Sequence, residues 1–216
     1  QMCIRDRVIA WVRGLVEFTT RLEGDRARIA SELNAGEDPG ALVELSFGSG
    51  DSHNGGRTVG ICTFESGCKV VYKPRNGRID VVFAGIVDWA NDRLDESLRL
   101  RVPRTIDRDR WCWAEFIPGR ACASRVELED YYLRMGTLLG ILHTLQGNDF
   151  HLENVIAHGP HPVPIDLETV CVPNSNAPDP DGEADAAITL LNHSVLRTLL
   201  LPNVIGFRGG DLRSLG

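Results

Sequence analysis

The sequence of 216 residues lacks the features that mark several large classes of protein. Its longer apolar runs, such as those at 81–90 and 138–145, are much shorter than the about 20 residues that a helix needs to cross a bilayer. No secretory signal and no internal repeat is visible. Because 43% of the residues are hydrophobic and 25% are charged, we expect a globular, cytoplasmic protein without a membrane span.

Cysteine pairs and an excess of basic residues are also absent. None of the six cysteines forms a Cys-x-x-Cys pair, so reduced thiols are a simpler interpretation than a disulfide framework. The net charge is −7, which disfavours non-specific binding to the phosphates of nucleic acids. No nucleic-acid partner is therefore expected.

Hydrophobic periodicity and turn residues predict a mixture of helices and strands. Helices are predicted at 8–33 with a break near Gly24, at 79–94, from Ser124 onward, and at 185–201 up to Pro202. Strands or extended segments are predicted at 41–47, 58–64, 68–73, 98–106, 109–117 and 163–170. A β-rich first half, a connector, a helix and then a polar loop with a strand is the order of elements in a bilobal kinase.

The polar stretch NDFHLENVIAHGPHPVPIDLET at 148–169 carries the strongest candidate site. Asp149 and Asn154 lie five positions apart, and Asp166 follows Asn154 after 11 intervening residues. Phosphoryl transfer needs a carboxylate that orients or deprotonates a hydroxyl, and it needs amide and carboxylate oxygens that hold Mg²⁺. The spacing therefore favours a phosphoryl-transfer site, whereas a polar loop with a capping aspartate is the non-functional alternative.

Two further features fit the same chemistry. Lys73 ends the apolar segment VVYK, which is where a kinase keeps its phosphate-pairing lysine, although a solvated lysine at a strand end is commoner. The stretch GSGDSHNGGR at 48–57 has glycines that let backbone N–H groups approach phosphates, but it matches neither GxGxxG nor a Walker motif. A polar surface hairpin would look similar.

Other catalytic and metal chemistries have weaker support. His151, His158 and His161 lie close together, yet their spacing is not that of a zinc site, and the last two are interpreted as surface histidines. No GxSxG elbow is present, which disfavours a serine hydrolase.

The motifs, taken together, match a known family. GDSHNGGRTV, KVVYKPR, WAEFIPG, YYLRMGTLLGILHTL, NDFHLENVIAHGPHPVPIDLET and SVLRTLLLP resemble, in this order, the dehydratase domain of class II (LanM-type) lanthipeptide synthetases. The resemblance covers about residues 40 to 205. It implies an α+β, bilobal, lipid-kinase-like fold, with an antiparallel sheet in the N-lobe and a mainly helical, truncated C-lobe.

The resemblance also implies an activity. Such enzymes use ATP and Mg²⁺ to phosphorylate Ser and Thr of a ribosomally made precursor peptide, and they then eliminate the phosphate to give dehydroalanine and dehydrobutyrine. The precursor has a leader and a Ser/Thr/Cys-rich core. A separate C-terminal zinc cyclase adds the Cys thiols, so no zinc is expected in this chain.

Site roles follow from the same resemblance. Asp149 would orient or deprotonate the hydroxyl with help from His151, and Lys73 would pair with nucleotide phosphate. Asn154 and Asp166 would hold Mg²⁺, with support from Glu168. The loop over the phosphates would contribute Asp51, His53, Asn54, Gly55, Gly56 and Arg57.

The ends of the chain suggest a piece of a longer protein. We expect an N-terminal helical segment at 1–40, a kinase-like N-lobe at 41–120 and a partial C-lobe with the catalytic loop at 121–216. Residues 1–7 look non-native, and the residues that the family uses for elimination are expected beyond 216.

Two other functions remain open at this stage. One is a small-molecule phosphotransferase of the aminoglycoside-kinase type, which also pairs an Asp-x-His-x-x-Asn motif with a later aspartate. The other is a non-catalytic, kinase-like module that binds peptides. The precursor peptide, the final product and the oligomeric state do not follow from the sequence.

Overall fold

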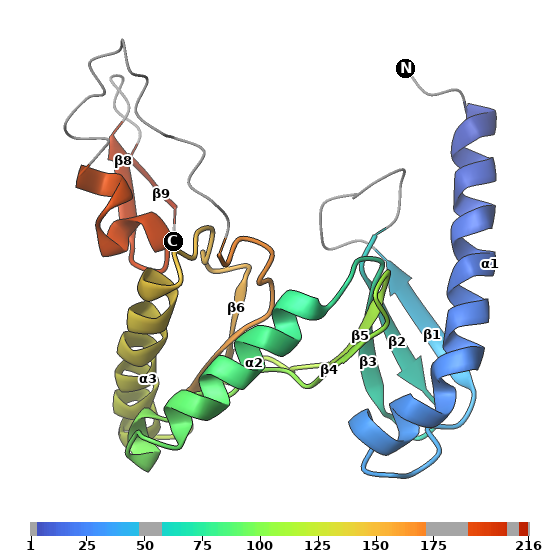
Figure 1. Ribbon diagram of the computed structural model, residues 1–216, viewed down its shortest axis with the longest axis horizontal. Coiled ribbons are helices and arrows are strands. Elements are labelled where there is room, and N and C mark those ends of the chain that lie inside the picture. Colours follow the sequence, from blue (N-terminus) through green and yellow to red (C-terminus); the bar gives the residue numbers. More distant parts are fainter. Residues whose placement is uncertain (1–3, 48–57, 172–189, 207–211, 216) are drawn as a thin grey trace. The chain divides into compact units, whose positions relative to one another are not determined.

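The protein is described by a computed structural model over residues 4–47, 58–171, 190–206 and 212–215 (Figure 1). The chain divides into two compact units. The first comprises Gln1–Val82 and Pro103–Phe116, and the second comprises Phe83–Val102 and Ile117–Gly216. The division does not follow the chain order, because each unit is built from two stretches of sequence.

The first unit contains a five-stranded sheet. Its strands are β1 (Leu42–Phe47), β2 (Gly60–Phe64), β3 (Lys69–Lys73), β4 (Thr105–Asp107) and β5 (Cys112–Glu115). They lie in the order β1-β2-β3-β5-β4, and every neighbouring pair is antiparallel. Alternate residues of β2 are buried, as expected for a sheet with one covered face. The strands predicted at 41–47, 58–64 and 68–73 are confirmed, whereas those predicted at 98–106 and 109–117 are shorter than expected.

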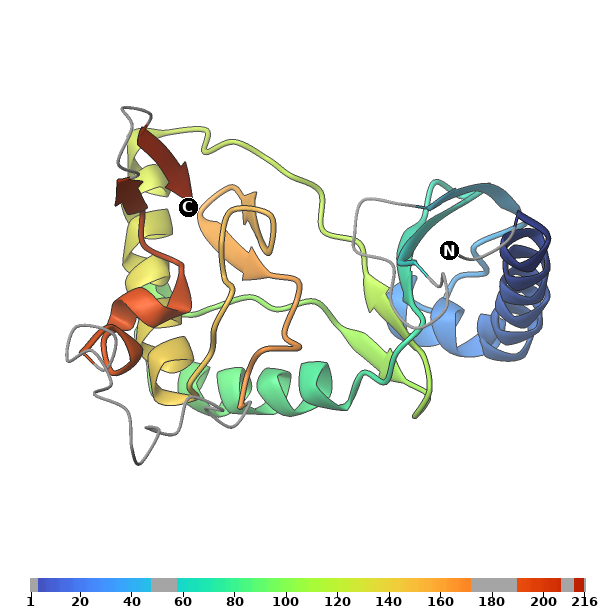
Figure 2. The same cartoon turned by 90° about the horizontal axis from the view of Figure 1, so that it is seen from above.

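A long helix covers the sheet of this unit. Helix α1 (Ile4–Arg28) continues directly into the π-helical turn η1 (Ile29–Leu33), and it lies along one side of the strands (Figure 2). Phe18 joins the core by an edge-on contact with Tyr72, whose ring centroid is 5.2 Å away. The predicted break near Gly24 is wrong, because one glycine costs a helix only about 1 kcal/mol and tertiary packing outweighs it.

A buried carboxylate holds α1 on the sheet. Asp25 has an exposed fraction of 1%, and its Oδ2 accepts the indole N–H groups of Trp111 at 2.7 Å and of Trp113 at 2.9 Å. Its Oδ1 lies 2.9 Å from Nε of Arg108. A fully buried carboxylate needs such partners, since an uncompensated charge in the interior is strongly destabilising.

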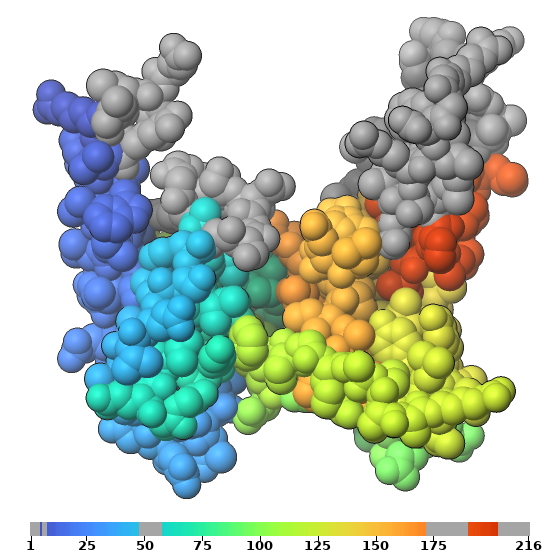
Figure 3. All heavy atoms as spheres, turned by 180° about the vertical axis from the view of Figure 1, so that it is seen from behind, coloured from blue at the N-terminus to red at the C-terminus, as the bar shows by residue number. Residues whose placement is uncertain are grey.

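The second unit is built around one helix. Its elements are most of α2 (Arg78–Asn91), η2 (Glu96–Leu98), α3 (Arg125–Thr144), β6 (Val155–His158), β7 (His161–Pro164), η3 (Val195–Thr198), β8 (Asn203–Gly206) and β9 (Leu212–Leu215). Helix α3 contacts β7, η2 and η3, and the space-filling view shows it (yellow) packed against the hairpin (orange) (Figure 3). Buried Arg134 stabilises this packing because its guanidinium donates to the carbonyls of Arg99, Pro160 and Glu96.

The start of α3 agrees with the prediction from Ser124. The Ser124 hydroxyl accepts the N–H of Glu127 at 3.2 Å, and Glu127 Oε2 accepts the N–H of Ala123 at 2.7 Å. This is a variant of the capping box, in which two N–H groups at a helix start gain side-chain partners. The Ala123 hydrogen bond is the main reason why the pKa of Glu127 is lowered.

The secondary structure predicted for the C-terminal part of the chain is partly wrong. The strand predicted at 163–170 ends at Pro164, because Asp166 Oδ1 accepts the N–H of Glu168 at 3.3 Å and turns the chain. A second strand, β6, pairs with β7 and was predicted only as part of a loop. The single helix predicted at 185–201 is wrong over its described part, since helical residues 190–192 end before η3 and Leu199 has a left-handed φ of 58°.

None of the helices in the described ranges combines the length and the hydrophobicity that crossing a membrane requires.

Candidate functional site

The predicted site residues fall into three groups. Lys73 belongs to the first unit, and Asp149, His151, Asn154, Asp166 and Glu168 belong to the second. The residues predicted to cover the phosphates lie outside the described ranges: Asp51, His53, Asn54, Gly55, Gly56 and Arg57.

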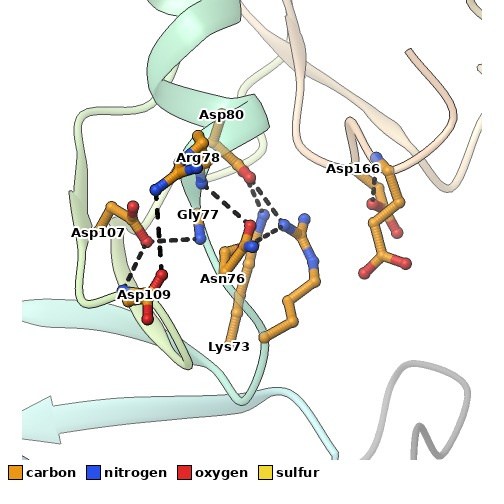
Figure 4. Close-up of polar contacts among 10 residues, drawn as sticks. Lys73, Asn76, Gly77, Arg78, Asp80, Asp107, Asp109 and Asp166 are labelled. Atoms are coloured by element: carbon orange, nitrogen blue, oxygen red, sulfur yellow. Dashed lines mark hydrogen bonds and ion pairs between the residues drawn. The ribbon is translucent and has the colours of Figure 1, made fainter. Parts of the chain in front are cut away.

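Lys73 is held by a buried ion pair. It is the last residue of β3, its exposed fraction is 8%, and its Nζ lies 3.0 Å from Oδ1 of Asp80 in the first turn of α2 (Figure 4). The other oxygen of Asp80, Oδ2, accepts a hydrogen bond of 2.7 Å from Arg75. One carboxylate therefore orients two cations, and the sum of these three charges is positive.

Asp80 and Arg75 were not predicted from the sequence. A signal was present, because an acidic residue in the first turn of a helix that directly follows Lys73 is well placed to interact with that lysine. The two residues lie seven positions apart in the sequence, however, and their pairing depends on the turn between β3 and α2.

That turn is itself fixed tightly. The N–H of Gly77 donates to Asp107 Oδ1 at 2.8 Å (Figure 4). A Cβ atom on Gly77 would come within 2.7 Å of the Cβ of Cys112, so the turn passes too close to β5 for a side chain. The close approach sets the start of α2 and therefore the position of Asp80.

Asp149 has an unusual backbone. Its φ is 65°, in the left-handed region that residues other than glycine rarely adopt. Its N–H donates to Asn148 Oδ1 at 2.7 Å, and its carbonyl accepts the amide N–H of Asn154 at 2.7 Å. The next N–H, that of buried Phe150, donates to the Thr198 carbonyl at 2.9 Å. Such conformations persist where the surroundings enforce them, and they cluster at functional sites.

His151 and Asp149 form a polar pair at the surface of the second unit. His151 Nε2 lies 3.4 Å from Asp149 Oδ1, and the two side chains are 30% and 50% exposed. The N–H of Glu153 donates to His151 Nδ1 at 3.3 Å. Because that nitrogen accepts, a neutral His151 carries its proton on Nε2, which is the nitrogen that faces Asp149.

The β6–β7 hairpin brings Asn154 and Asp166 to the same end of two paired strands. The N–H of Ile165 donates to the Asn154 carbonyl at 2.9 Å, one step beyond the pairing of Val155 with Pro164. Asn154 and Asp166 are half-buried, and Glu168 is exposed. The structure thus assembles Asp149, His151, Asn154 and Asp166 within one unit.

The donor set fits a magnesium ion. Asn154, Asp166 and Glu168 carry the oxygen donors that Mg²⁺ prefers. Among the described residues there is no group of three or more His, Cys, Asp or Glu side chains that could hold a metal. Mg²⁺ is usually bound by one or two carboxylates together with substrate phosphates. It does not need three or more protein side chains, so this finding is compatible with a magnesium site.

The chain is therefore an α+β protein. In its second unit, the β6–β7 hairpin supports the polar loop that contains Asp149. The family model described as "Domain of unknown function (DUF4135)" matches residues 1–214, and the chain belongs to this family. The chain is also 33% identical over 128 residues to the lacticin 481/lactococcin biosynthesis protein LcnDR2 of Lactococcus lactis subsp. lactis. The match covers 56% of this chain and 14% of the length of that protein.

These two matches confirm the resemblance to class II lanthipeptide synthetases that the sequence motifs indicated.

Proposed function

We propose that this chain carries the phosphorylating part of a lanthipeptide dehydratase. It would use ATP and Mg²⁺ to phosphorylate Ser and Thr of a ribosomally made precursor peptide, as the first half of dehydration to dehydroalanine and dehydrobutyrine. The similarity to a lacticin biosynthesis protein supports a place in lantibiotic biosynthesis.

One observation carries the proposal. The side-chain amide of Asn154 donates a hydrogen bond to the Asp149 carbonyl, and the N–H of Ile165, the residue before Asp166, donates to the Asn154 carbonyl, so two hydrogen bonds bring these three segments together. Phosphoryl transfer requires such a combination of a carboxylate near the hydroxyl and oxygen donors for the metal.

The residues would act in the following way. Asp149 orients the substrate hydroxyl or accepts its proton, and the Nε2–H of His151 holds the Asp149 carboxylate. Asn154 and Asp166 would hold Mg²⁺, which when bound neutralises charge on the phosphates. Asp80 holds the ammonium of Lys73 near the end of β3, where Lys73 would pair with nucleotide phosphate.

The proposal includes a fold and partners. A five-stranded antiparallel sheet with a helix in one unit, and a second unit built around helix α3 with two hairpins, suit a bilobal, kinase-like architecture. The substrate would be a precursor with a leader and a Ser/Thr/Cys-rich core, and a cyclase domain would complete the modification.

Mass spectrometry of the precursor peptide tests this function. The full-length protein that carries this chain is incubated with precursor, ATP and Mg²⁺, and the wild type should add phosphate to Ser or Thr or remove water from it. Asp149→Asn should lower the rate about 10²- to 10⁴-fold, the usual contribution of a general base. Asp92→Asn, which changes an exposed aspartate of the same unit, is the matched control and should act like the wild type.

Full modification by Asp149→Asn would refute the catalytic role of Asp149. Phosphorylation of an aminoglycoside-type small molecule with no reaction on any precursor would favour the small-molecule phosphotransferase.

A further inference from the structure

Two neighbouring segments of the second unit carry the proposed chemistry. The loop 145–154 contains Asp149, and the turn 165–171 contains Asp166. The segments are joined at one end by the bond from Ile165 N–H to the Asn154 carbonyl, 2.9 Å long. They are joined at the other end by the bond from Cys171 N–H to the Leu145 carbonyl, 3.0 Å long.

A third tie lies between these two ends. The hydroxyl of Thr169 donates a hydrogen bond to the carbonyl of Asn148. This carbonyl and the N–H of Asp149 belong to the same peptide group, and that N–H donates to Asn148 Oδ1 at 2.7 Å. Both polar atoms of the peptide that enters Asp149 are therefore held in place.

We propose that Thr169 is a positioning residue of the phosphoryl-transfer site, an inference that rests on the function proposed above. Thr169 lies three residues after Asp166 on the same turn, and its hydroxyl fixes the peptide that precedes Asp149. It sets the distance between the carboxylate that handles the hydroxyl and the carboxylate that holds the metal.

The left-handed backbone of Asp149 explains why such a tie is needed. A φ of 65° is uncommon for a residue other than glycine, although aspartate adopts it more readily than most, and neighbouring contacts help to hold Asp149 in this conformation. Loss of the Thr169 hydroxyl leaves the Asn148 carbonyl without this donor and lets the peptide rotate. Asp149 and Asp166 then no longer meet one Mg²⁺–phosphate group in the right geometry.

The test compares two substitutions of Thr169 in the full-length protein. Thr169→Val keeps the shape and removes the hydroxyl, whereas Thr169→Ser keeps the hydroxyl. Thr144→Val is the matched control, because the Thr144 hydroxyl bonds only the Gly140 carbonyl, at 2.8 Å within α3, among the hydrogen bonds of the described residues. Affinity for Mn²⁺ in the presence of a non-hydrolysable ATP analogue is measured by paramagnetic resonance. The folded fraction of each variant is measured alongside by circular dichroism, because reversible unfolding weakens the apparent affinity in proportion to the folded fraction that is lost.

We expect Thr169→Val to weaken Mn²⁺ binding about 10-fold, the lower end of the effect of residues that support metal ligands. Thr169→Ser and Thr144→Val should stay within about 2-fold of the wild type. The rate of precursor phosphorylation should fall in parallel for Thr169→Val alone.

An unchanged Mn²⁺ affinity for Thr169→Val would overturn the inference. If that variant does not fold, Thr169→Ala decides the matter, because it also removes the hydroxyl that donates to the Asn148 carbonyl but places no second methyl group there; unchanged affinity in Thr169→Ala would equally overturn the inference. Should the wild type bind Mn²⁺ in a Thr169-dependent way and yet phosphorylate no peptide, the proposed function fails while the positioning role stands.

Discussion

At the scale of single residues, candidate side chains depend on neighbours that the sequence did not indicate. Lys73, Asp149, Asn154 and Asp166 were predicted as site residues because phosphoryl transfer restricts both the residue types and their spacing, and this assignment stays a prediction. The pairing of Asp80 with Lys73 was missed, since it depends on the geometry of one turn that Gly77 makes possible. The spacing of residues in a sequence predicts candidate reactive residues better than it predicts the contacts that position their side chains.

The Lys73–Asp80 pair gives a first prediction about stability and nucleotide binding. Asp80→Asn removes the charge partner of a lysine whose side chain is 10% exposed, so the free energy of unfolding should fall by about 3 kcal/mol. The KM for ATP should rise as well, because Lys73 is no longer oriented. Urea unfolding and steady-state kinetics measure the two effects.

Asp109→Asn provides the control for that substitution. The Asp109 side chain is 83% exposed, and its Oδ1 lies 4.0 Å from a guanidinium nitrogen of Arg78. The substitution should therefore change the free energy of unfolding of the protein by no more than about 0.5 kcal/mol. Equal stability of the two variants would contradict the structural role given to Asp80.

His161 gives a prediction about pH. Burial lowers the pKa of His161 below its usual 6.5, and the nearby cations Arg134 and Arg101 add to this effect. The unfolded chain therefore binds a proton at His161 more readily than the folded chain does. Stability should be complete above about pH 6.5 and should fall as the pH drops through the lowered pKa.

Urea unfolding between pH 7 and pH 5 checks this expectation. His161→Gln should show a shallower loss of stability than the wild type, whereas His193→Gln, at an exposed histidine, should retain the wild-type slope. Identical slopes for the wild type and His161→Gln would argue against the effect.

At the scale of elements, periodicity predicted the three N-terminal strands and the capped start of α3. It failed where side chains redirect the backbone. The strand predicted through Asp166 stops early because the Asp166 carboxylate accepts a backbone N–H, and β6 was missed because a four-residue strand is too short to show a period. These two features create the hairpin end on which the candidate site rests.

The anchoring of α1 is the clearest prediction at this scale. Sequence alone would place Asp25 in solvent, since aspartate is almost never fully buried without partners. Asp25→Ala would leave two indole N–H groups and Arg108 without their acceptor, so the free energy of unfolding should fall by about 3–5 kcal/mol.

Glu23→Ala is the control for that anchor, because Glu23 is exposed on the same helix. It should change the urea midpoint little. A similar small change for Asp25→Ala would show that the two tryptophans do not depend on this carboxylate.

At the scale of the whole molecule, the chain forms two compact units that each use two separate stretches of sequence. The predicted segments 1–40, 41–120 and 121–216 were continuous, because a reading along the chain cannot tell which unit an intervening stretch joins. The stretch 83–102 lies between two strands of the first unit in the sequence, yet it belongs to the second unit. Lys73 belongs to one unit, and Asp149, Asn154 and Asp166 belong to the other.

The most direct measurement of the central claim follows the γ-phosphate of ATP. The full-length protein is incubated with precursor peptide, Mg²⁺ and ATP labelled in its γ-phosphate. We expect label on Ser or Thr of the peptide, or one labelled phosphate released for each residue that loses water. Dehydration of the peptide without consumption of ATP, or consumption of ATP with the peptide unchanged, would contradict it.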